Sequence, residues 1–383
     1  MPAEMTPRQR MLAALSHQEP DRVPLDIGGG NSTSLLVETF ENLKDHLGIS
    51  STTRIANKAF RIAALDEETM VRLGSDVRPI GLGAPANWKP PPSAPGTFVD
   101  VWGITWRRAD YPGGYYWELS EHPLAQATIS DLDSYRWPDP DDPGWYQGLE
   151  EKVRNLHDNT PYALLGDFGF KGFWETGYFI RGLEQSLLDL VANQPFWLAF
   201  MDRMLELNCA FAERFLAITG PYLTALRIAD DLATQRGPLM SPKTYRAMIK
   251  PYQKRLNEVI KQHTDATIFY HSCGNITSLL GDLVEAGFEA INPVQVSAIP
   301  DVAALKSEYG EKLSFWGAID TQHVLPHGTE AEVREEVRLR IQQLGEGGGY
   351  IAAGVHNLNP DIPPQNIVAM SEAVRKYGRY PLQ

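Results

Sequence analysis

The chain has 383 residues, 43% of them hydrophobic and 22% charged, which is typical of a globular protein. Its net charge is 35 − 48 = −13, and no block of lysine and arginine stands out, so nucleic acid and anionic membranes are not expected partners. No run of 18 apolar residues predicts a membrane span, the first residues do not resemble a signal peptide, and two cysteines cannot form a disulfide framework. We therefore expect a cytoplasmic protein.

The first expected element is a helix that begins after Thr6, with Pro7 in its first turn and Gln9 completing a capping box, and that ends near Ser16. A short apolar strand, 23–27, then leads into three glycines and an asparagine. These glycines lack the G-x-G-x-x-G spacing of a dinucleotide-binding loop, so a simple turn is expected there.

Residues 84–145 differ in kind, because they are rich in proline, glycine and aromatic residues. They alternate like strands around a Pro-Gly-Gly turn at 112–114, which predicts a β-hairpin insertion with a lid as one role. Aromatic side chains here and after the next strand either line a pocket for an aromatic substrate or pack the hairpin. They are Trp102, Trp106, Tyr115, Tyr116, Trp117, Phe168, Phe170, Phe173 and Trp174.

From residue 150 onward, apolar strands alternate with amphipathic helices. The expected strands are 162–166, 223–229, 267–271, 288–294, 312–317 and 349–354, and the expected helices are 178–192, 195–218, 241–263, 275–286 and 329–344. With 23–27 and 77–82 the strands number eight, which favours a single (β/α)₈ TIM-barrel domain over residues 1–383, with a doubly wound sheet as the alternative.

In such a barrel the chemistry lies where the strands end. Polar residues follow six consecutive strands: Asp167, Asp230 and Asp231, His271 with Cys273, Asn292 and Gln295, Asp320, and His356 with Asn357. Loops are polar in general, but so regular a series favours a functional site.

His271 and Cys273 are separated by one residue, so in a strand their side chains share a face. Catalytic zinc uses three protein ligands and keeps one position open. Cys209 lies inside an apolar helix, where packing is the expected role, and most other histidines fall on helices or polar loops. His356, after the last strand, is the best-placed third ligand, although the spacing alone is a weak signal and core packing explains it more often.

Several segments resemble the uroporphyrinogen decarboxylase superfamily over nearly the whole chain. They are TPRQRMLAALSHQEPDRVPLD, DDLATQRGPLMSPKTYRAMIKPYQKRL, YHSCGN, INPVQ, FWGAIDTQHVLPHGT and GVHNLNPDIPPQNIVAM. The resemblance implies a (β/α)₈ barrel, in agreement with the strand count.

Two branches of the superfamily differ in chemistry. Decarboxylases carry an arginine-rich R-Q-A-G-R-Y stretch near the N-terminus, whereas this chain reads IGGGNSTSL there, and a substrate with many carboxylates needs cationic donors. The other branch, zinc-dependent methyltransferases that act with corrinoid proteins, has H-x-C-G and a later cysteine. His271–Gly274 matches the first motif, and His356 stands at the position of the later cysteine, where decarboxylases also have histidine. The resemblance therefore implies zinc bound by His271, Cys273 and His356.

The histidine changes the charge of the implied centre. One histidine and two thiolates give 2 − 2 = 0, whereas two histidines and one thiolate give 2 − 1 = +1, a stronger Lewis acid that suits an oxygen leaving group. We therefore expect transfer of a methyl group from an ether-type, methoxyaromatic or similar small donor to Co(I) of a corrinoid. Asp231, Asp167 and Asp320 are candidates for donating the proton or orienting a ligand, with a turn or helix cap as the alternative role of each.

No D-x-H-x-x-G signature for corrinoid binding is present, so the cobalamin cofactor is expected on a separate protein. The expected substrate-binding residues are Trp102, Tyr116, Phe168, Trp174, Asn292 and Gln295. Three alternatives stay open at this point: a decarboxylase-like lyase, a thiol-methylating corrinoid methyltransferase, and a non-catalytic binding protein. The oligomeric state is also open, with a homodimer among the options.

Overall fold

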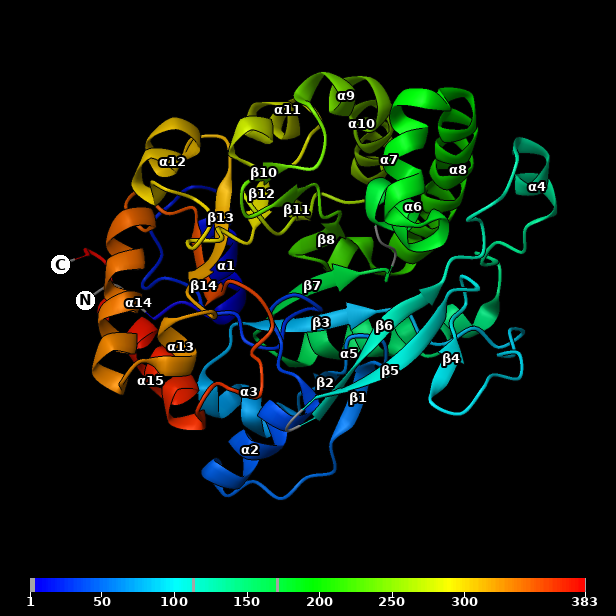
Figure 1. Cartoon of the computed structure of the whole chain (residues 1–383). Coiled ribbons are helices and arrows are strands. Elements are labelled where there is room, and N and C mark those ends of the chain that lie inside the picture. Colours follow the sequence, from blue (N-terminus) through cyan, green and yellow to red (C-terminus); the bar gives the residue numbers. More distant parts are fainter. Residues whose placement is uncertain (1–3, 112–113, 170–171, 383) are drawn as a thin grey trace.

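The computed structural model describes residues 4–111, 114–169 and 172–382. Seven parallel strands form a curled central sheet in the order β14-β13-β12-β11-β8-β7-β3 (Figure 1). Because this order follows the sequence without a reversal, the fold is a TIM barrel and not a doubly wound sheet. The strands are β3 (Val77–Gly81), β7 (Ala163–Asp167), β8 (Ala225–Ala229), β11 (Thr267–His271), β12 (Ala290–Asn292), β13 (Ser314–Ile319) and β14 (Tyr350–Gly354).

The eighth predicted strand, 23–27, is present only as a bridge. It lies between β14 and β3. On the β14 side it exchanges backbone hydrogen bonds with Ala352, and on the β3 side the Asp76 N–H donates to the Leu25 carbonyl. Pro24 has no N–H to donate, and the N–H of Leu25 donates to the Asp76 side chain at 2.8 Å instead of to a backbone carbonyl of β3. The segment therefore closes the barrel without forming a regular ladder.

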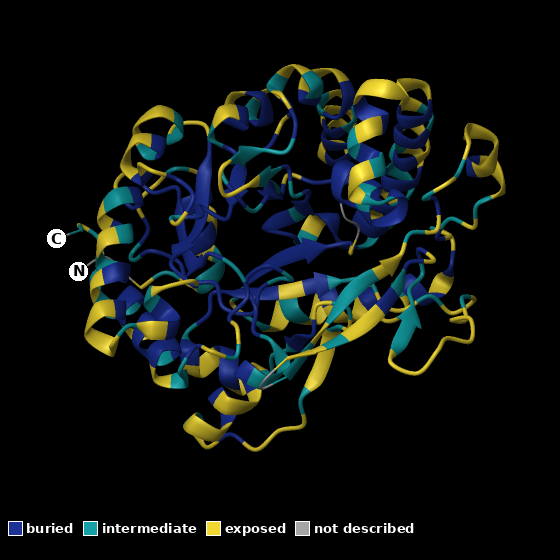
Figure 2. Ribbon diagram, in the orientation of Figure 1, coloured by how far each residue is buried: buried dark blue, intermediate teal, exposed yellow. Residues whose placement is uncertain are grey.

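Helices cover the outside of the sheet, with exposed residues outward and buried residues toward the strands (Figure 2). The Thr6 capping box is confirmed at the start of the first helix. The predicted helix 178–192 is interrupted at Gly182, whose φ is 91°, and the predicted helix 241–263 is interrupted at Ile249, two residues before a proline. The helices are α1 (Pro7–Leu15), α2 (Val37–Leu47), α3 (Glu67–Leu73), α5 (Leu149–Asn159), α6 (Phe173–Arg181), α7 (Leu183–Ala192), α8 (Gln194–Thr219), α9 (Pro242–Met248), α10 (Lys250–Lys261), α11 (Leu280–Glu285), α12 (Val302–Tyr309), α13 (Val324–His327), α14 (Glu330–Leu344) and α15 (Pro364–Tyr377).

A separate antiparallel sheet lies beside the barrel (Figure 1). Its strands are β4 (Thr97–Val99), β5 (Thr105–Tyr111) and β6 (Gly114–Glu121), and a short helix, α4 (Ile129–Ser134), follows. Residues 112–113 of the expected turn lie outside the described residues. The role of this sheet as a lid stays a prediction.

A small hairpin of β1 (Arg54–Asn57) and β2 (Ile62–Ala64) is attached to this sheet. The Arg61 guanidinium stacks on the Tyr115 ring, with 3.7 Å to the ring centroid, and donates to the Tyr115 carbonyl. The Phe60 ring packs edge-on against Trp106. The hairpin therefore presents Phe60 and its neighbours from a fixed position near the barrel mouth.

Inside the barrel, inward side chains change character along the strands. An apolar layer contains Val77, Ala163, Leu165, Ala225, Phe269, Ala290, Trp316, Ile351 and Ala353, with Met11 and Leu15 from α1. Two residues further along four of the strands, the side chains on the same face are polar: Asp167, Arg227, His271 and Asn292. A packed apolar floor thus supports a polar layer at the C-terminal ends of the strands. In the part of the chain that the structure describes, no helix combines the length and apolarity needed to cross a membrane.

Candidate metal centre

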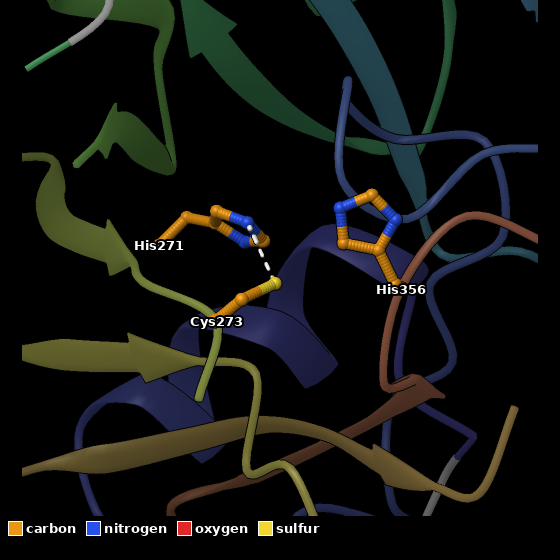
Figure 3. A group of neighbouring side chains, drawn as sticks. All are labelled: His271, Cys273 and His356. Carbon is orange, nitrogen blue, oxygen red and sulfur yellow. Dashed lines mark hydrogen bonds between the residues drawn. The ribbon is translucent and has the colours of Figure 1, made fainter. Parts of the chain in front are cut away.

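Three metal-binding side chains meet at the mouth of the barrel. His271 is the last residue of β11, Cys273 follows it, and His356 lies just after β14. One donor atom from each lies within 4.8 Å of the others, and Cys273 Sγ is 3.7 Å from His271 Nε2. The two imidazole rings lie edge to face with centroids 5.5 Å apart, and the thiol projects toward His271 (Figure 3).

The spacing of the three donors fits a tetrahedral zinc ion. Bonds of about 2.0 Å to nitrogen and about 2.3 Å to sulfur place tetrahedral donors about 3.3 to 3.6 Å apart. The observed sulfur-to-nitrogen distance of 3.7 Å is close to this, and the 4.8 Å limit on the whole set requires a shift of only about 1 Å. Two imidazoles and one thiol are ligands that zinc accepts readily, and three of them leave one position open.

Asn292 fixes the orientation and tautomer of His271. Its Nδ2 donates to the Trp316 carbonyl at 3.1 Å, and a carbonyl can only accept, so Oδ1 is the atom that faces His271 Nδ1 at 2.5 Å. Nδ1 must then carry the proton, which leaves the lone pair of Nε2 directed at the centre. This is how outer-shell partners commonly prepare a histidine for a metal.

The backbone that carries Cys273 is also held in place. The Cys273 N–H donates to Asp231 Oδ1 at 2.8 Å, and the same oxygen is 3.8 Å from His271 Nε2. The Gly274 N–H donates to Gln295 Oε1 at 2.7 Å. Gly274 has φ of 90°, and a Cβ there would meet the Thr234 carbonyl at 2.6 Å, so only glycine fits this turn.

Burial sets the protonation of the cluster. It raises the pKa of the Cys273 thiol well above its usual value, and neighbouring Asp231 adds to this rise. Burial, assisted by the charge of Arg227, lowers the pKa of His271 well below its usual value and that of His356 to about 4. Both imidazoles are therefore in the neutral, metal-binding form at pH 7, whereas the thiol must release its proton when a cation binds.

A small cavity of about 120 Å³ opens beside the cluster. The residues that line it come from many parts of the chain: Asn31, Ser32, Asn57, Phe60, Asp167, Gly169, Glu175, Arg227, Ala229, Asp231, His271, His356 and Asn357. The Arg227 guanidinium donates from Nη1 to Asp167 Oδ2 at 3.0 Å and from Nε to Ser32 Oγ at 2.9 Å.

A buried carboxyl group, Asp26, holds the loop that carries Asn31 and Ser32. It accepts the Gly29 N–H at 2.9 Å, the Thr33 hydroxyl at 2.7 Å and the Trp316 indole N–H at 2.9 Å. Burial raises the pKa of Asp26 to about 6 despite these three donors. The loop is thus tied to the barrel floor through Trp316.

Comparison with known families agrees with this architecture. The family model described as uroporphyrinogen decarboxylase (URO-D) matches residues 124–377, about two-thirds of the chain. The chain belongs to the uroporphyrinogen decarboxylase family. Relatives named uroporphyrinogen decarboxylase include one from Pseudoalteromonas translucida, 23% identical over 69% of this chain and 74% of its own length. Another, from Pseudoalteromonas atlantica, is 22% identical over 69% of this chain and 74% of its own length.

A solved structure also shares this fold from end to end. It is a methyltransferase from Methanosarcina mazei, with a TM-score of 0.66 and 18% sequence identity, and the match covers 98% of this chain and 99% of the other. At this identity the likeness establishes the fold alone. The shared fold therefore extends over both the insertion and the polar mouth.

The three predicted carboxylates lie in different surroundings. Asp231 and Asp167 line the cavity. Asp320 does not: its carboxylate accepts the N–H groups of Gln322 and His323 and bonds the His323 ring, so it caps the turn after β13. These contacts correspond to the turn-forming role that the sequence analysis left open for Asp320.

The predicted substrate-binding residues do not line the cavity. Asn292 and Gln295 lie behind the donors, where they hold His271 and Gly274. Phe168 and Trp174 are buried in the hydrophobic core, Trp102 is buried too, and Tyr116 is 51% exposed. Phe170 lies outside the described residues. The aromatic side chain of the cavity lining is Phe60.

The lining residues that the sequence analysis missed include Arg227, Glu175, Phe60, Ser32 and Asn57. Arg227 had a usable signal, because a charged side chain in the middle of an apolar barrel strand has to face a polar interior. Glu175 in the first turn of α6 and Phe60 between β1 and β2 had none, because only tertiary packing brings these segments to the mouth.

Proposed function

We propose that this protein is a zinc-dependent methyltransferase that moves a methyl group from a small O-methylated compound to a corrinoid carried by a separate protein. The observation that carries the proposal is the convergence of two imidazoles and one thiol beside a small polar cavity. His271, Cys273 and His356 would hold the metal, whose contribution is Lewis acidity at the oxygen that leaves.

The charge of this donor set favours an oxygen leaving group. Two neutral imidazoles and one thiolate leave a zinc centre with a charge of +1, whereas a second thiolate would make it neutral. A cationic centre withdraws electrons from a bound oxygen more strongly. The thiol-methylating alternative is better served by the neutral set, which this chain does not provide.

The side chains around the donors supply orientation and a proton. Asn292 keeps Nε2 of His271 directed at the centre, and Asp231 positions Cys273 by accepting the Cys273 backbone N–H. Asp167 already accepts from Arg227, from Asn31 and from the Gly169 N–H. We assign delivery of a proton to the departing oxygen to Asp231, because its Oδ1 lies 3.8 Å from His271 Nε2, with Glu175 as the second carboxyl group at the cavity.

The decarboxylase-like alternative is supported by the names of the relatives and the family. The cavity argues against a tetrapyrrole substrate. Its volume of about 120 Å³ is well below the roughly 300–1,000 Å³ of sites for larger ligands. Arg227 is the one lysine or arginine among the described lining residues, and it is already paired with Asp167. A small methyl donor suits both the volume and the charge.

The test uses protein prepared without chelator. Elemental analysis should find about one zinc per chain. The zinc-loaded protein should form methylcobalamin from free cob(I)alamin and a panel of small methoxy compounds, followed by absorbance. A Cys273→Ala variant should lose both zinc and activity. Failure to bind zinc, or equal rates of methyl transfer in the variant, would refute the proposal.

A further inference from the structure

Arg227 presents an unused hydrogen-bond donor to the cavity. It lies in the middle of β8, and its side chain is 11% exposed. Nε donates to Ser32 and Nη1 donates to Asp167. Within residues 4–111, 114–169 and 172–382, no acceptor bonds Nη2. A largely buried guanidinium normally has its donors satisfied, so an unpaired nitrogen that borders a cavity points to a ligand.

The guanidinium is held rigidly. Asp167, its partner, is itself fixed by the side-chain amide of Asn31 at 2.9 Å and by the Gly169 N–H at 2.8 Å. Asn31 in turn is fixed through its carbonyl, which accepts from the Asn357 amide at 2.8 Å. Arg227 is therefore preorganised, and a ligand that binds Nη2 need not order a flexible side chain.

Two further donors lie on the same cavity. Ser32 Oγ accepts from Arg227, and no described residue accepts its hydroxyl proton, which is therefore available to a ligand. Asn57 Oδ1 accepts the Phe60 N–H at 3.2 Å, which leaves the Asn57 amide N–H groups available among the described residues. The carboxyl group of Asp231 instead accepts the Cys273 N–H at 2.8 Å. The cavity thus has several donors around Arg227 and an acid, Asp231, beside the metal ligands.

We propose that Arg227 Nη2, with Ser32 and Asn57, binds the carboxylate of the methyl donor, so that the substrate is a small methoxy-substituted carboxylic acid. This inference rests on the proposed function and names the substrate class of the same site. A charge-assisted hydrogen bond from a guanidinium recognises an anionic oxygen more strongly than a neutral one. A carboxylate is the smallest such group, and the cavity of about 120 Å³ must also accommodate the methoxy group.

The carboxylate subsite and the metal ligands are near neighbours. Arg227 lies on β8, which pairs directly with β11, the strand that ends at His271. The same small cavity touches Arg227 and both histidines. The acid group and the methoxy oxygen of the substrate must therefore be separated by only a few bonds.

The test measures binding by calorimetry to zinc-loaded protein. The probes are three methoxy acids, each paired with its neutral amide: methoxyacetate, 3-methoxypropanoate and 2-methoxybenzoate. Variants are Arg227→Gln, which removes the charge, and Arg227→Lys, which keeps it without the planar fork. Arg214→Gln is the matched control, because Arg214 also pairs with an aspartate, Asp141, but outside this cavity. Melting temperature and zinc content are recorded for each.

In the wild type and the Arg214 control, at least one acid should bind about 10- to 100-fold more tightly than its amide. Arg227→Gln should abolish that preference by weakening acid binding much more than amide binding, with partial recovery in Arg227→Lys. If Arg227→Gln alone does not fold, the double variant Asp167→Asn with Arg227→Gln removes the unpaired carboxylate and serves the same comparison.

Equal binding of acids and amides to the wild type, or an acid preference that survives Arg227→Gln, overturns the inference. The two proposals can fail separately. Methyl transfer from the neutral amides at the same rate as from the acids would uphold the methyltransferase and overturn the carboxylate subsite. Acid binding that depends on Arg227, without any methylcobalamin, would uphold the subsite and overturn the methyltransferase.

Discussion

Replacement of Asn292 by alanine tests whether His271 is prepared for a metal. The fully buried amide makes two hydrogen bonds, to His271 Nδ1 and to the Trp316 carbonyl. Without it, the buried carbonyl loses its partner, which costs about 1–3 kcal/mol of unfolding free energy in the metal-free protein. The imidazole also loses the contact that fixes its tautomer, and removal of such a partner typically lowers metal affinity about 10- to 100-fold.

The two effects are measured separately. Urea unfolding of the metal-free protein gives the loss of stability, and a competition titration against a chromophoric chelator gives the zinc affinity. Asn292→Asp is the matched control, since its carboxylate still accepts from Nδ1–H although it cannot donate to the Trp316 carbonyl. It should therefore lose stability but retain zinc affinity. Zinc affinity in Asn292→Ala equal to that of the wild type would show that this contact does not prepare a ligand.

Three further predictions concern the ligands and a buried acid. Cys273→Ser should remove most of the bound zinc and preserve the fold, because a hydroxyl is a poor substitute for thiolate; full zinc retention in elemental analysis would contradict the ligand assignment. His356→Cys should keep zinc but slow cleavage of methoxy compounds because the centre loses its positive charge, whereas His356→Ala should lower zinc affinity; unchanged zinc in the alanine variant would exclude His356 as a ligand. The pKa of Asp26 is raised from 3.8 to about 6, so the native state holds this proton more tightly than the unfolded state. Its contribution, about 3 kcal/mol, should be present in full below about pH 4 and disappear as the pH rises through about 6. Urea unfolding of wild type and Asp26→Asn across this range checks it, and parallel pH curves would contradict it.

The sequence predicts the barrel well because the patterns that indicate its strands and helices are local and recur along the chain. Each strand is a short apolar run and each helix is amphipathic, so their alternation alone indicates the fold. The strand at 23–27 is the exception, because Pro24 has no N–H to donate and the Leu25 N–H donates to the Asp76 side chain, which the apolar pattern does not reveal. The broken helices show the same limit, since the backbone change at Gly182 is only a weak signal in an amphipathic pattern.

The part of the candidate site that lies at the ends of the strands was predictable from the sequence. The one-residue spacing of His271 and Cys273 predicts a shared direction, and their donor atoms are 3.7 Å apart. That the three residues bind zinc stays a prediction. The opposite wall of the cavity was not predictable, because Phe60 reaches it through a hairpin attached to a separate sheet. Aromatic abundance in the insertion pointed instead to residues that pack that sheet.

Closure of the barrel by residues 23–27 has a consequence for how the protein is made. This segment needs Ala352 as its neighbour, and the Ser34 N–H that follows it donates to Asn357, 323 residues away in sequence. A ribosome delivers residues 23–34 long before Ala352 and Asn357, so their contacts with these two residues can form only after β14 has been synthesised. Such distant contacts slow folding and leave apolar surface exposed in the meantime. The wall of the cavity that carries Ser32 therefore gains its contacts with Asn357 only after the last strand of the barrel has been synthesised.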